Sequence, residues 1–231
     1  MMDAKMKGMV MAGMMGLSLV LGLMAVLGGS WLTSDEFMGE EVDGDTEVTY
    51  GLNAMHIEDP DGDCDDDTAD AVEDVYTGME VECVGDTLLA TWSMSDQCDF
   101  FGDVASDAKD AGLEGDDLDE YTDAEDDACS TASAGTMGTI GMWGGVVLAL
   151  VATLMMVLPM AGIDAMDGIP EIGQKVISWG AGGLMLLGML LWFFMLPDGD
   201  ASGGMTLYMA GAAMTIGLGS TAIGQFIPEN E

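Results

Sequence analysis

Acidic side chains with the spacing of a calcium loop occur in the segment EDPDGDCDDDTAD, which runs from Glu58 to Asp70. Calcium loops of the twelve-residue type place oxygen ligands at positions 1, 3, 5, 7, 9 and 12. Counted from Asp59, every one of these positions is a carboxylate: Asp59, Asp61, Asp63, Asp65, Asp67 and Asp70. The pattern therefore predicts a candidate Ca²⁺ site. It departs from the loop pattern in two places, since Cys64 stands where the loop turns on glycine and the last ligand is Asp instead of the longer Glu.

A solvated acidic surface is the other interpretation of this run. The chain has 42 acidic residues against four lysines and no arginine, and its formal net charge is −38. Of these acids, 34 lie between Ser34 and Cys129, where the only basic side chains are Lys109 and His56. Crowded carboxylates attract cations whether or not a defined site exists, and an acidic coat is also typical of salt-adapted proteins. The sequence leaves both interpretations open.

The charge and the residue types also narrow the function classes. A segment this negative repels the phosphate backbone, which excludes nucleic acid as its partner. A single histidine, His56, and the lack of arginine leave few groups for acid–base, oxyanion or phosphate chemistry. The sequence has no phosphate-binding glycine loop and no nucleophile elbow. We therefore expect a non-enzymatic protein with no catalytic residue and with Ca²⁺ as its only candidate cofactor.

All four cysteines of the chain fall in the acidic segment: Cys64, Cys83, Cys98 and Cys129. An even number of cysteines confined to one polar segment predicts disulfides and an oxidising, extracytoplasmic location. Four cysteines allow three pairings, and sequence spacing does not choose firmly among them. We favour Cys64–Cys83 together with Cys98–Cys129.

Four apolar runs lie outside the acidic segment: residues 8–30, 136–160, 176–196 and 205–224. None contains Asp, Glu, Lys, Arg or His, and each has the roughly 20 residues that a helix needs to cross a bilayer. They predict four transmembrane helices. The first run is longer than the roughly 7–15 residues of a signal-peptide core, which favours a retained span over a cleaved signal.

The positions of the lysines predict the orientation, because lysines near span ends tend to stay in the cytoplasm. Lys5 and Lys7 precede the first run and Lys175 precedes the third, so all three share one side if the N-terminus is cytoplasmic. We therefore expect a protein of the cell membrane with both termini in the cytoplasm and the acidic domain outside. The expected order is N-terminus 1–7, span 8–30, outer domain 31–135, span 136–160, cytoplasmic loop 161–175, span 176–196, outer loop 197–204, span 205–224 and tail 225–231.

Small residues recur at four-residue spacing in three of the runs: Gly8, Ala12 and Gly16; Gly141 and Gly145; Gly211, Thr215 and Gly219. Such faces let helix backbones approach closely within a bilayer. They predict packing within the bundle, or self-association with another subunit through one face. The absence of ionisable residues from the runs argues against an ion pump or a transporter of charged substrates.

The outer segment, residues 31–135, predicts an α+β domain. Residues 47–54 and 87–94 alternate apolar and polar side chains, as does the shorter stretch 79–83, and Gly85-Asp86 predicts a tight turn between the last two strands. From Phe100 the apolar period becomes helical, and a second weak helical stripe runs over residues 118–128. The fold class we expect is an α-helical integral membrane protein, a four-helix bundle with a small disulfide-linked α+β outer domain between its first two spans.

Trp31 begins the outer segment, and Gly51-Leu52 follow it. This layout resembles that of claudin-type four-helix membrane proteins, which have a tryptophan and a Gly-Leu-Trp at the corresponding places. Asn53 stands here in place of the second tryptophan. The resemblance implies a cytoplasmic N-terminus, a first outer loop built as a small sheet plus helix with a disulfide, and a short second outer loop. It transfers no functional residue.

These observations favour a membrane protein that presents an acidic outer domain for interaction or adhesion, with Ca²⁺ assisting the contact. The bilayer, a protein partner and a second copy of the chain are its expected neighbours. A channel or transporter accessory, whose acidic domain concentrates cations at a neutral pore, is the alternative function, because a pore lined by hydroxyls and glycine needs no intramembrane charge.

Overall fold

The computed structural model describes residues 4–37, 40–42, 45–60, 64–163, 170–197 and 201–226. The chain divides into two compact units. One, which we call the helical unit, consists of Met1–Leu27, Gly138–Leu191 and Thr206–Glu231. The other, the sheet unit, consists of Gly28–Met137 and Trp192–Met205.

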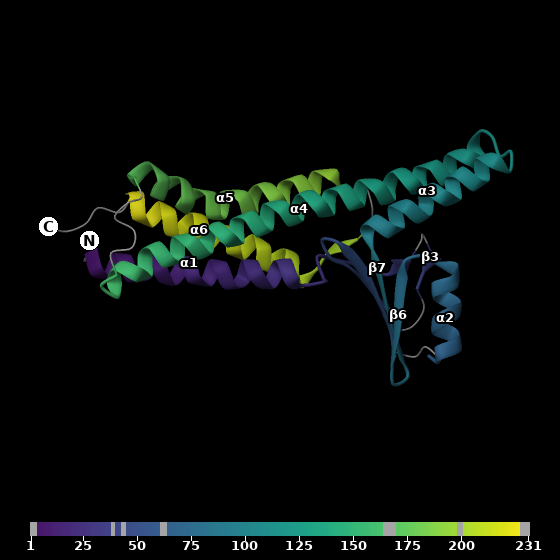
Figure 1. Ribbon diagram of the computed structural model, residues 1–231, viewed down its shortest axis with the longest axis horizontal. Coiled ribbons are helices and arrows are strands. Elements are labelled where there is room, and N and C mark those ends of the chain that lie inside the picture. The colour runs from purple at the N-terminus through teal and green to yellow at the C-terminus, as the bar shows by residue number, and fades with distance from the viewer. Residues whose placement is uncertain are drawn as a thin grey trace. The chain divides into compact units, whose positions relative to one another are not determined.

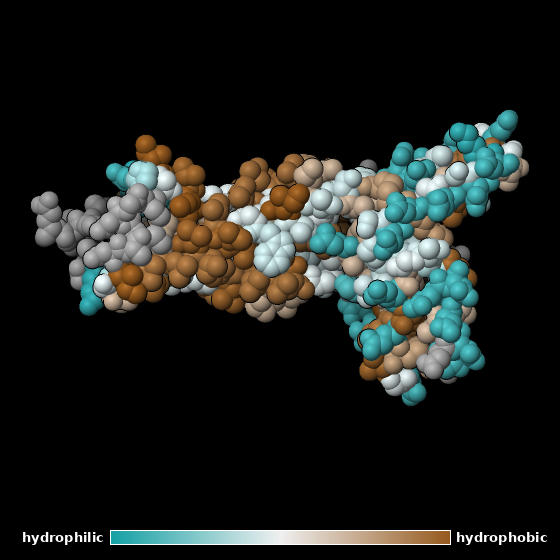
Figure 2. Space-filling view, in the orientation of Figure 1, coloured by the Kyte–Doolittle hydropathy of each residue, from teal (hydrophilic) through white to brown (hydrophobic). Residues whose placement is uncertain are grey.

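Among the residues that the structure describes, four helices are long and apolar enough to cross a membrane: α1 Ala4–Leu27, α4 Asp116–Met160, α5 Glu171–Met195 and α6 Met205–Phe226. Their apolar stretches lie side by side (Figure 1). Large apolar side chains such as Leu17, Val147 and Phe193 are exposed on their outer surface, and this surface is mostly hydrophobic (Figure 2). An apolar exterior suits lipid better than water.

Close packing inside the helical unit depends on small residues and hydroxyls. A Cβ added at Gly188 of α5 would lie 2.9 Å from the Cα of Gly141 in α4, so the two backbones touch. The hydroxyl of Ser18 in α1 donates to the carbonyl oxygen of Ala213 in α6 (2.6 Å). That of Ser220 in α6 donates to Met11 in α1 (2.9 Å). The predicted role of Gly141 in internal packing is thus confirmed.

The face of α6 near Gly211 differs. No atom lies within 4 Å of a Cβ added at Gly211, and Thr215 one turn later is exposed. The hydroxyl of Thr215 donates to the carbonyl of Gly211 in its own helix (2.7 Å). Association with another subunit through this face stays a prediction.

In the described part of the chain, the sheet unit is built on a six-stranded antiparallel sheet with the order β6-β7-β5-β4-β1-β8. Its strands are β1 Leu32–Ser34, β4 Glu47–Tyr50, β5 Ala54–Asp59, β6 Met79–Val84, β7 Thr87–Ser93 and β8 Ser202–Gly203. Strands β2 Glu36–Phe37 and β3 Glu40–Glu41 pair separately. Helices α2 Asp66–Val75 and α3 Met94–Asp110 complete the unit together with the first part of α4.

Two strand expectations need correction. Residues 47–54, predicted as one strand, comprise the whole of β4, a turn and the first residue of β5. The chain reverses at Gly51, whose amide donates to the carbonyl of Ala54 (2.7 Å). Alternation continues through the turn, which is why the reversal was missed. Strand β8, in the loop 197–204, was not predicted; it pairs with β1, a partner about 170 residues away in sequence. The tight turn at Gly85 is confirmed, with φ +69°.

The core of the sheet unit gathers around Trp92, which is 1% exposed. The buried residues are Val48, Met55, Met79, Ala90, Trp92 and Met94. Tyr76 and Phe100 pack edge-on against the Trp92 ring, with centroids 5.6 and 5.3 Å away. Trp92 is the one aromatic side chain among these buried residues, and partly buried aromatic side chains pack around the cluster.

The helices of the sheet unit begin earlier and run longer than predicted. Helix α3 begins at Met94 instead of Phe100, because the hydroxyl of Ser93 caps it by accepting from the amide of Asp96 (3.1 Å). The predicted helix 118–128 and the predicted span 136–160 are one continuous helix, α4. Residues 129–138 contain no proline, and the hydroxyl of Thr136 donates back to the Ala132 carbonyl (3.0 Å) within the helix.

Four glycines in the sheet unit lie where other parts of the unit pack closely against the backbone. We call Gly29, Gly51, Gly135 and Gly204 the glycine collar. A Cβ at Gly135 would overlap the carbonyl oxygen of Leu52, and one at Gly204 would overlap that of Ser30. Beside them, the buried rings of Trp31 and Trp192 meet edge to face with centroids 4.9 Å apart.

Gly135→Ala tests the collar. The added methyl group has no room beside the Leu52 carbonyl, so we expect a loss of about 1–3 kcal/mol in the free energy of unfolding. Thermal unfolding of the purified full chain in detergent measures it. Gly183→Ala is the matched control, because it is also helical and no atom lies within 4 Å of the added Cβ. Equal unfolding midpoints for the two variants would contradict the close approach.

Candidate functional site

The acidic run Glu58–Asp70 does not form one continuous loop. Asp59 ends strand β5 and pairs with Leu88 of β7. Asp65 is the N-cap of α2, and Asp67 and Asp70 are exposed within that helix. The other two predicted ligands, Asp61 and Asp63, lie outside the described residues.

Asp65 has a clear local role. One of its carboxylate oxygens accepts from the amide and from the hydroxyl of Thr68, both at 2.7 Å. These hydrogen bonds to the ionised form lower the pKa of Asp65. Within the part of the chain that the structure describes, no three His, Cys, Asp or Glu side chains come together as a metal ion would require. Because two of its six ligands are not described, the Ca²⁺ site stays a prediction.

Helix α2 itself was missed from the sequence. Its aspartates also fit the spacing of a calcium loop. Its helical signals are the N-cap residue Asp65 and two apolar residues four positions apart, Val72 and Tyr76. Both apolar side chains pack against the core of the sheet unit. An aspartate before an apolar i, i+4 pair is a recognised helix-start signal.

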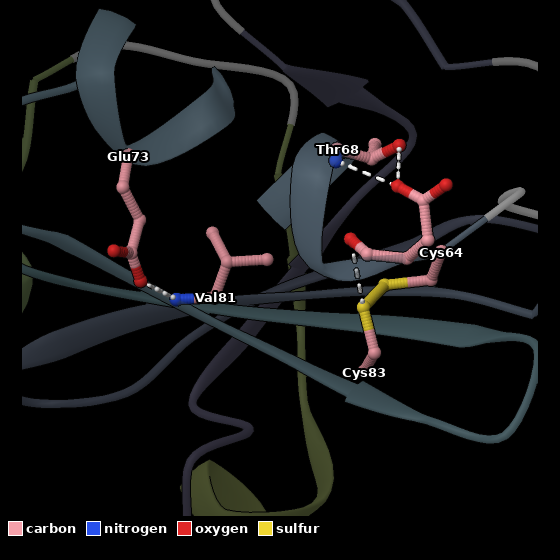
Figure 3. The surroundings of a disulfide bond; sticks show 6 residues. Cys64, Thr68, Glu73, Val81 and Cys83 are labelled. Carbon is pink, nitrogen blue, oxygen red and sulfur yellow. Dashed lines mark hydrogen bonds between the residues drawn. A yellow bond between two sulfur atoms is a disulfide. The ribbon is translucent and has the colours of Figure 1, made fainter. Parts of the chain in front are cut away.

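Two contacts fasten α2 to the neighbouring strand β6, and we call them the α2 clasp (Figure 3). The disulfide Cys64–Cys83 joins the residue before the N-cap to the strand, with Cα atoms 5.6 Å apart. Near the other end of the helix, the carboxylate of Glu73 accepts a hydrogen bond from the backbone amide of Val81 (2.8 Å). The role of Glu73 was not predicted from the sequence, because no local pattern marks an acid that accepts a hydrogen bond from the backbone of an edge strand.

The second disulfide, Cys98–Cys129, links α3 to α4 with a Cα separation of 4.6 Å. Both bonds have the pairing that the sequence favoured. Residues 94–129 thus form two helices joined by a short turn and a disulfide, which we call the acidic hairpin (Figure 1). Its only basic side chain is Lys109, and twelve of its acids are exposed: Asp99, Asp103, Asp107, Asp110, Glu114, Asp116, Asp117, Asp119, Glu120, Asp123, Asp126 and Asp127.

A polar row crosses the face of the sheet opposite the Trp92 core. Neighbouring strands place these residues in register, from β6 to β8: Glu80, Thr91, His56, Thr49, Thr33 and Ser202. A shallow groove of about 250 Å³ lies along part of this face, between the His56–Thr91 pair and the side chains of Glu47 and Glu58. The groove offers hydroxyl, imidazole and carboxylate groups to a polar ligand.

The surroundings of His56 disfavour its charged form. Its Nδ1 lies 3.1 Å from the hydroxyl of Thr91, and its ring is so close to Gly29 that a Cβ there would lie 2.7 Å from it. Burial of the ring lowers the pKa of His56 below its usual value of 6.5. Burial therefore disfavours an imidazolium beside the side chains of Glu47 and Glu58 in the groove.

Comparison with known proteins adds no assignment to these surfaces. No protein-family model matches the chain, and no characterised protein matches it significantly. The resemblance to the layout of claudin-type proteins stays an expectation from the sequence, because no comparison supports it. Any function must be argued from the chain's own residues.

Two substitutions of Asp65 separate helix capping from cation binding. Asp65→Ala removes the cap and we expect it to lower the unfolding midpoint, whereas Asp65→Asn keeps an oxygen acceptor and stays near wild type. A Ca²⁺ site would raise the wild-type midpoint when Ca²⁺ is added in high monovalent salt, and Asp65→Asn would lose that rise. Equal Ca²⁺ responses in wild type and Asp65→Asn would count against Asp65 as a ligand. Thermal unfolding of the full chain gives both readings.

His56 makes stability depend on pH. Because its pKa is lower in the folded chain than in the unfolded chain, folding becomes less favourable as the pH falls through and below 6.5. Protonation of the many acids also changes stability, so the useful quantity is the difference in unfolding midpoint between wild type and His56→Gln. We expect this difference to shift against wild type between about pH 7.5 and about pH 5. A difference that stays constant over this range would contradict the lowered pKa.

Proposed function

We propose that the chain is a non-enzymatic, four-pass membrane protein that presents the sheet unit outside the cell as an acidic interaction domain. Four apolar helices with exposed apolar side chains support the membrane location. Two disulfides support an oxidising compartment for the sheet unit. The lysines near the ends of the first and third apolar runs support cytoplasmic termini.

The observation that carries the proposal is the acidic hairpin. Its two helices are joined by the disulfide Cys98–Cys129 and display twelve exposed acids against the single Lys109. Like charges on a surface disfavour its compact form, and here a covalent bond holds the two helices together. A rigid, single-sign surface accelerates association with an oppositely charged partner and raises selectivity more than affinity. The hairpin therefore suits a protein partner that presents a basic surface.

Calcium can assist such a contact without a high-affinity site. Carboxylates crowded on α2 and on the acidic hairpin raise the local concentration of divalent cations. A cation held by the acids of one copy can also take carboxylate ligands from a second copy, since Ca²⁺ accepts 6–8 oxygen ligands. Adhesion between two copies would then require Ca²⁺, whereas binding to a basic partner would be weakened by it.

Charge neutralisation in the acidic hairpin tests the proposal. The full chain in lipid nanodiscs is titrated with a labelled lysine-rich peptide, and Asp103→Asn/Asp107→Asn/Asp110→Asn is compared with wild type. We expect binding to weaken on the order of tenfold at low salt, because each exposed charge contributes up to about 1 kcal/mol. The difference should fade as salt increases, since screening shortens the reach of charges.

The matched control neutralises three acids of helix α2, Asp67→Asn/Asp70→Asn/Asp74→Asn, and changes the net charge equally. Losses of equal size in the two triple variants would mean that total charge, and not the hairpin, attracts the peptide. Cation-selective conductance in liposomes containing the purified protein would contradict the non-transporting role and favour the accessory channel function.

A further inference from the structure

Strand β6 is one edge of the six-stranded sheet, and α2 lies beside it. In an antiparallel edge strand, alternate amides point away from the sheet and are free to pair with another strand. In β6 the amide of Val81 is one of these, because it donates to Glu73 (2.8 Å) and not to β7. The amides of Met79 and Cys83 share its direction by alternation. The outer edge of β6 is thus a row of donors beside α2.

Helix α2 occupies this edge at both of its ends. The amide of Met79 donates to the carbonyl of Tyr76, the C-cap residue of α2 (3.0 Å). The Glu73 carboxylate takes the amide of Val81, and Figure 3 shows the side chain reaching from the helix to the strand. The Cys64–Cys83 disulfide ties the N-terminal end of the helix to the same strand. At the middle of the edge, the Val81 amide is thus hydrogen-bonded to a side chain and not to another strand.

We propose that the outer edge of β6 is a strand-addition site for an extended basic segment of a partner protein, and that the α2 clasp keeps it closed. Extended segments bind sheet edges through backbone hydrogen bonds, while alternate side chains provide specificity. The two contacts of the clasp play different parts. The disulfide is a covalent hinge at one end of α2, and the Glu73–Val81 hydrogen bond is the latch that an incoming carbonyl oxygen replaces.

The charges along β6 select the occupant. Glu80 and Glu82 are exposed and point to the same face of the sheet, whereas Val81 between them points to the core. Antiparallel pairing of two β6 strands centred on Val81 would place Glu80 of one copy opposite Glu82 of the other. Like charges directly opposite one another destabilise a sheet. A segment with Lys or Arg at alternate positions would instead place a cation opposite Glu80 and another opposite Glu82, and both pairs would stabilise the sheet.

The basic segment also opens its own site. Its cationic side chains compete for the Glu73 carboxylate, and its carbonyl oxygens accept from the amide that Glu73 releases. A neutral strand would have to displace the Glu73 carboxylate from the Val81 amide without offering that carboxylate a cation in return. The inference rests on the proposed function in one respect, a cationic partner. To the charged contact of that partner with the acidic hairpin it adds backbone pairing of one extended segment with β6.

The experiment uses the full chain in nanodiscs and two labelled peptides of the sequence KTKVKTK. One is unmodified, and the other carries N-methyl groups on the amides of one edge, so that the charges match but that edge cannot pair. We expect the unmodified peptide to bind on the order of fivefold tighter, the effect of about one net hydrogen bond. Equal binding of the two peptides would overturn strand addition while leaving charge-driven binding, and with it the proposed function, in place.

Variants of the clasp give the second reading. Glu73→Ala removes the latch, and we expect it to tighten binding of the unmodified peptide on the order of fivefold, whereas Glu73→Gln keeps a side-chain carbonyl acceptor and stays near wild type. Cys64→Ser/Cys83→Ser should also tighten binding. Unchanged affinity in Glu73→Ala would overturn the latch.

A measurement on the wild-type chain needs no variant. Hydrogen exchange of the Val81 amide reports whether its N–H group is hydrogen-bonded, because hydrogen bonding slows exchange. We expect exchange to slow further when the unmodified peptide is added and to stay the same with the methylated peptide. Slowing of equal size with both peptides would contradict pairing at this edge.

Discussion

Backbone contact at the glycine collar is the constraint on which the sheet unit depends. The collar is where segments that continue into the apolar helices meet the sheet: Gly29 follows α1, Gly135 lies in α4 and Gly204 precedes α6. Gly135 and Gly204 each lie against a backbone carbonyl, so a side chain at either place would push the segments apart. With Trp31 and Trp192 buried beside them, these contacts hold together residues that are far apart in sequence.

Repulsion between its many carboxylates destabilises the folded sheet unit, and other interactions must offset it. Its core cluster has six buried residues, Trp92 among them, with partly buried aromatic residues beside them, while its surface displays many acids, twelve of them on the acidic hairpin. The two disulfides act on the parts with the least core: Cys64–Cys83 holds α2, and Cys98–Cys129 holds the acidic hairpin. Each stabilises by roughly 2–4 kcal/mol, mainly by restricting the unfolded chain. Such bonds keep acidic surfaces ordered without burying them.

Much of the fold was predictable because its signals are local. Runs of about 20 apolar residues predict the long helices, and the alternation in residues 87–94 predicts β7 within one residue of its end. The misses need information from elsewhere in the chain. Strand β8 has two residues and forms only because β1 lies beside it. The reversal at Gly51 is hidden because the apolar alternation continues through the turn. The continuity of α4 differs, because its signal is local: residues 129–138 contain no proline that would end the helix.

The candidate site was less predictable, because aspartate serves three physical roles with one sequence signature. It can ligate a cation, cap a helix or solvate a surface, and spacing alone does not separate these roles. Asp65 caps α2, Asp67 is exposed, and Asp59 ends a strand, although all three fit one ligand pattern. Glu73 shows the reverse. It matches no pattern, yet it takes the amide of an edge strand. Edge strands invite pairing, so an acid at this position decides which segments can join the sheet, and the surrounding glutamates favour basic ones.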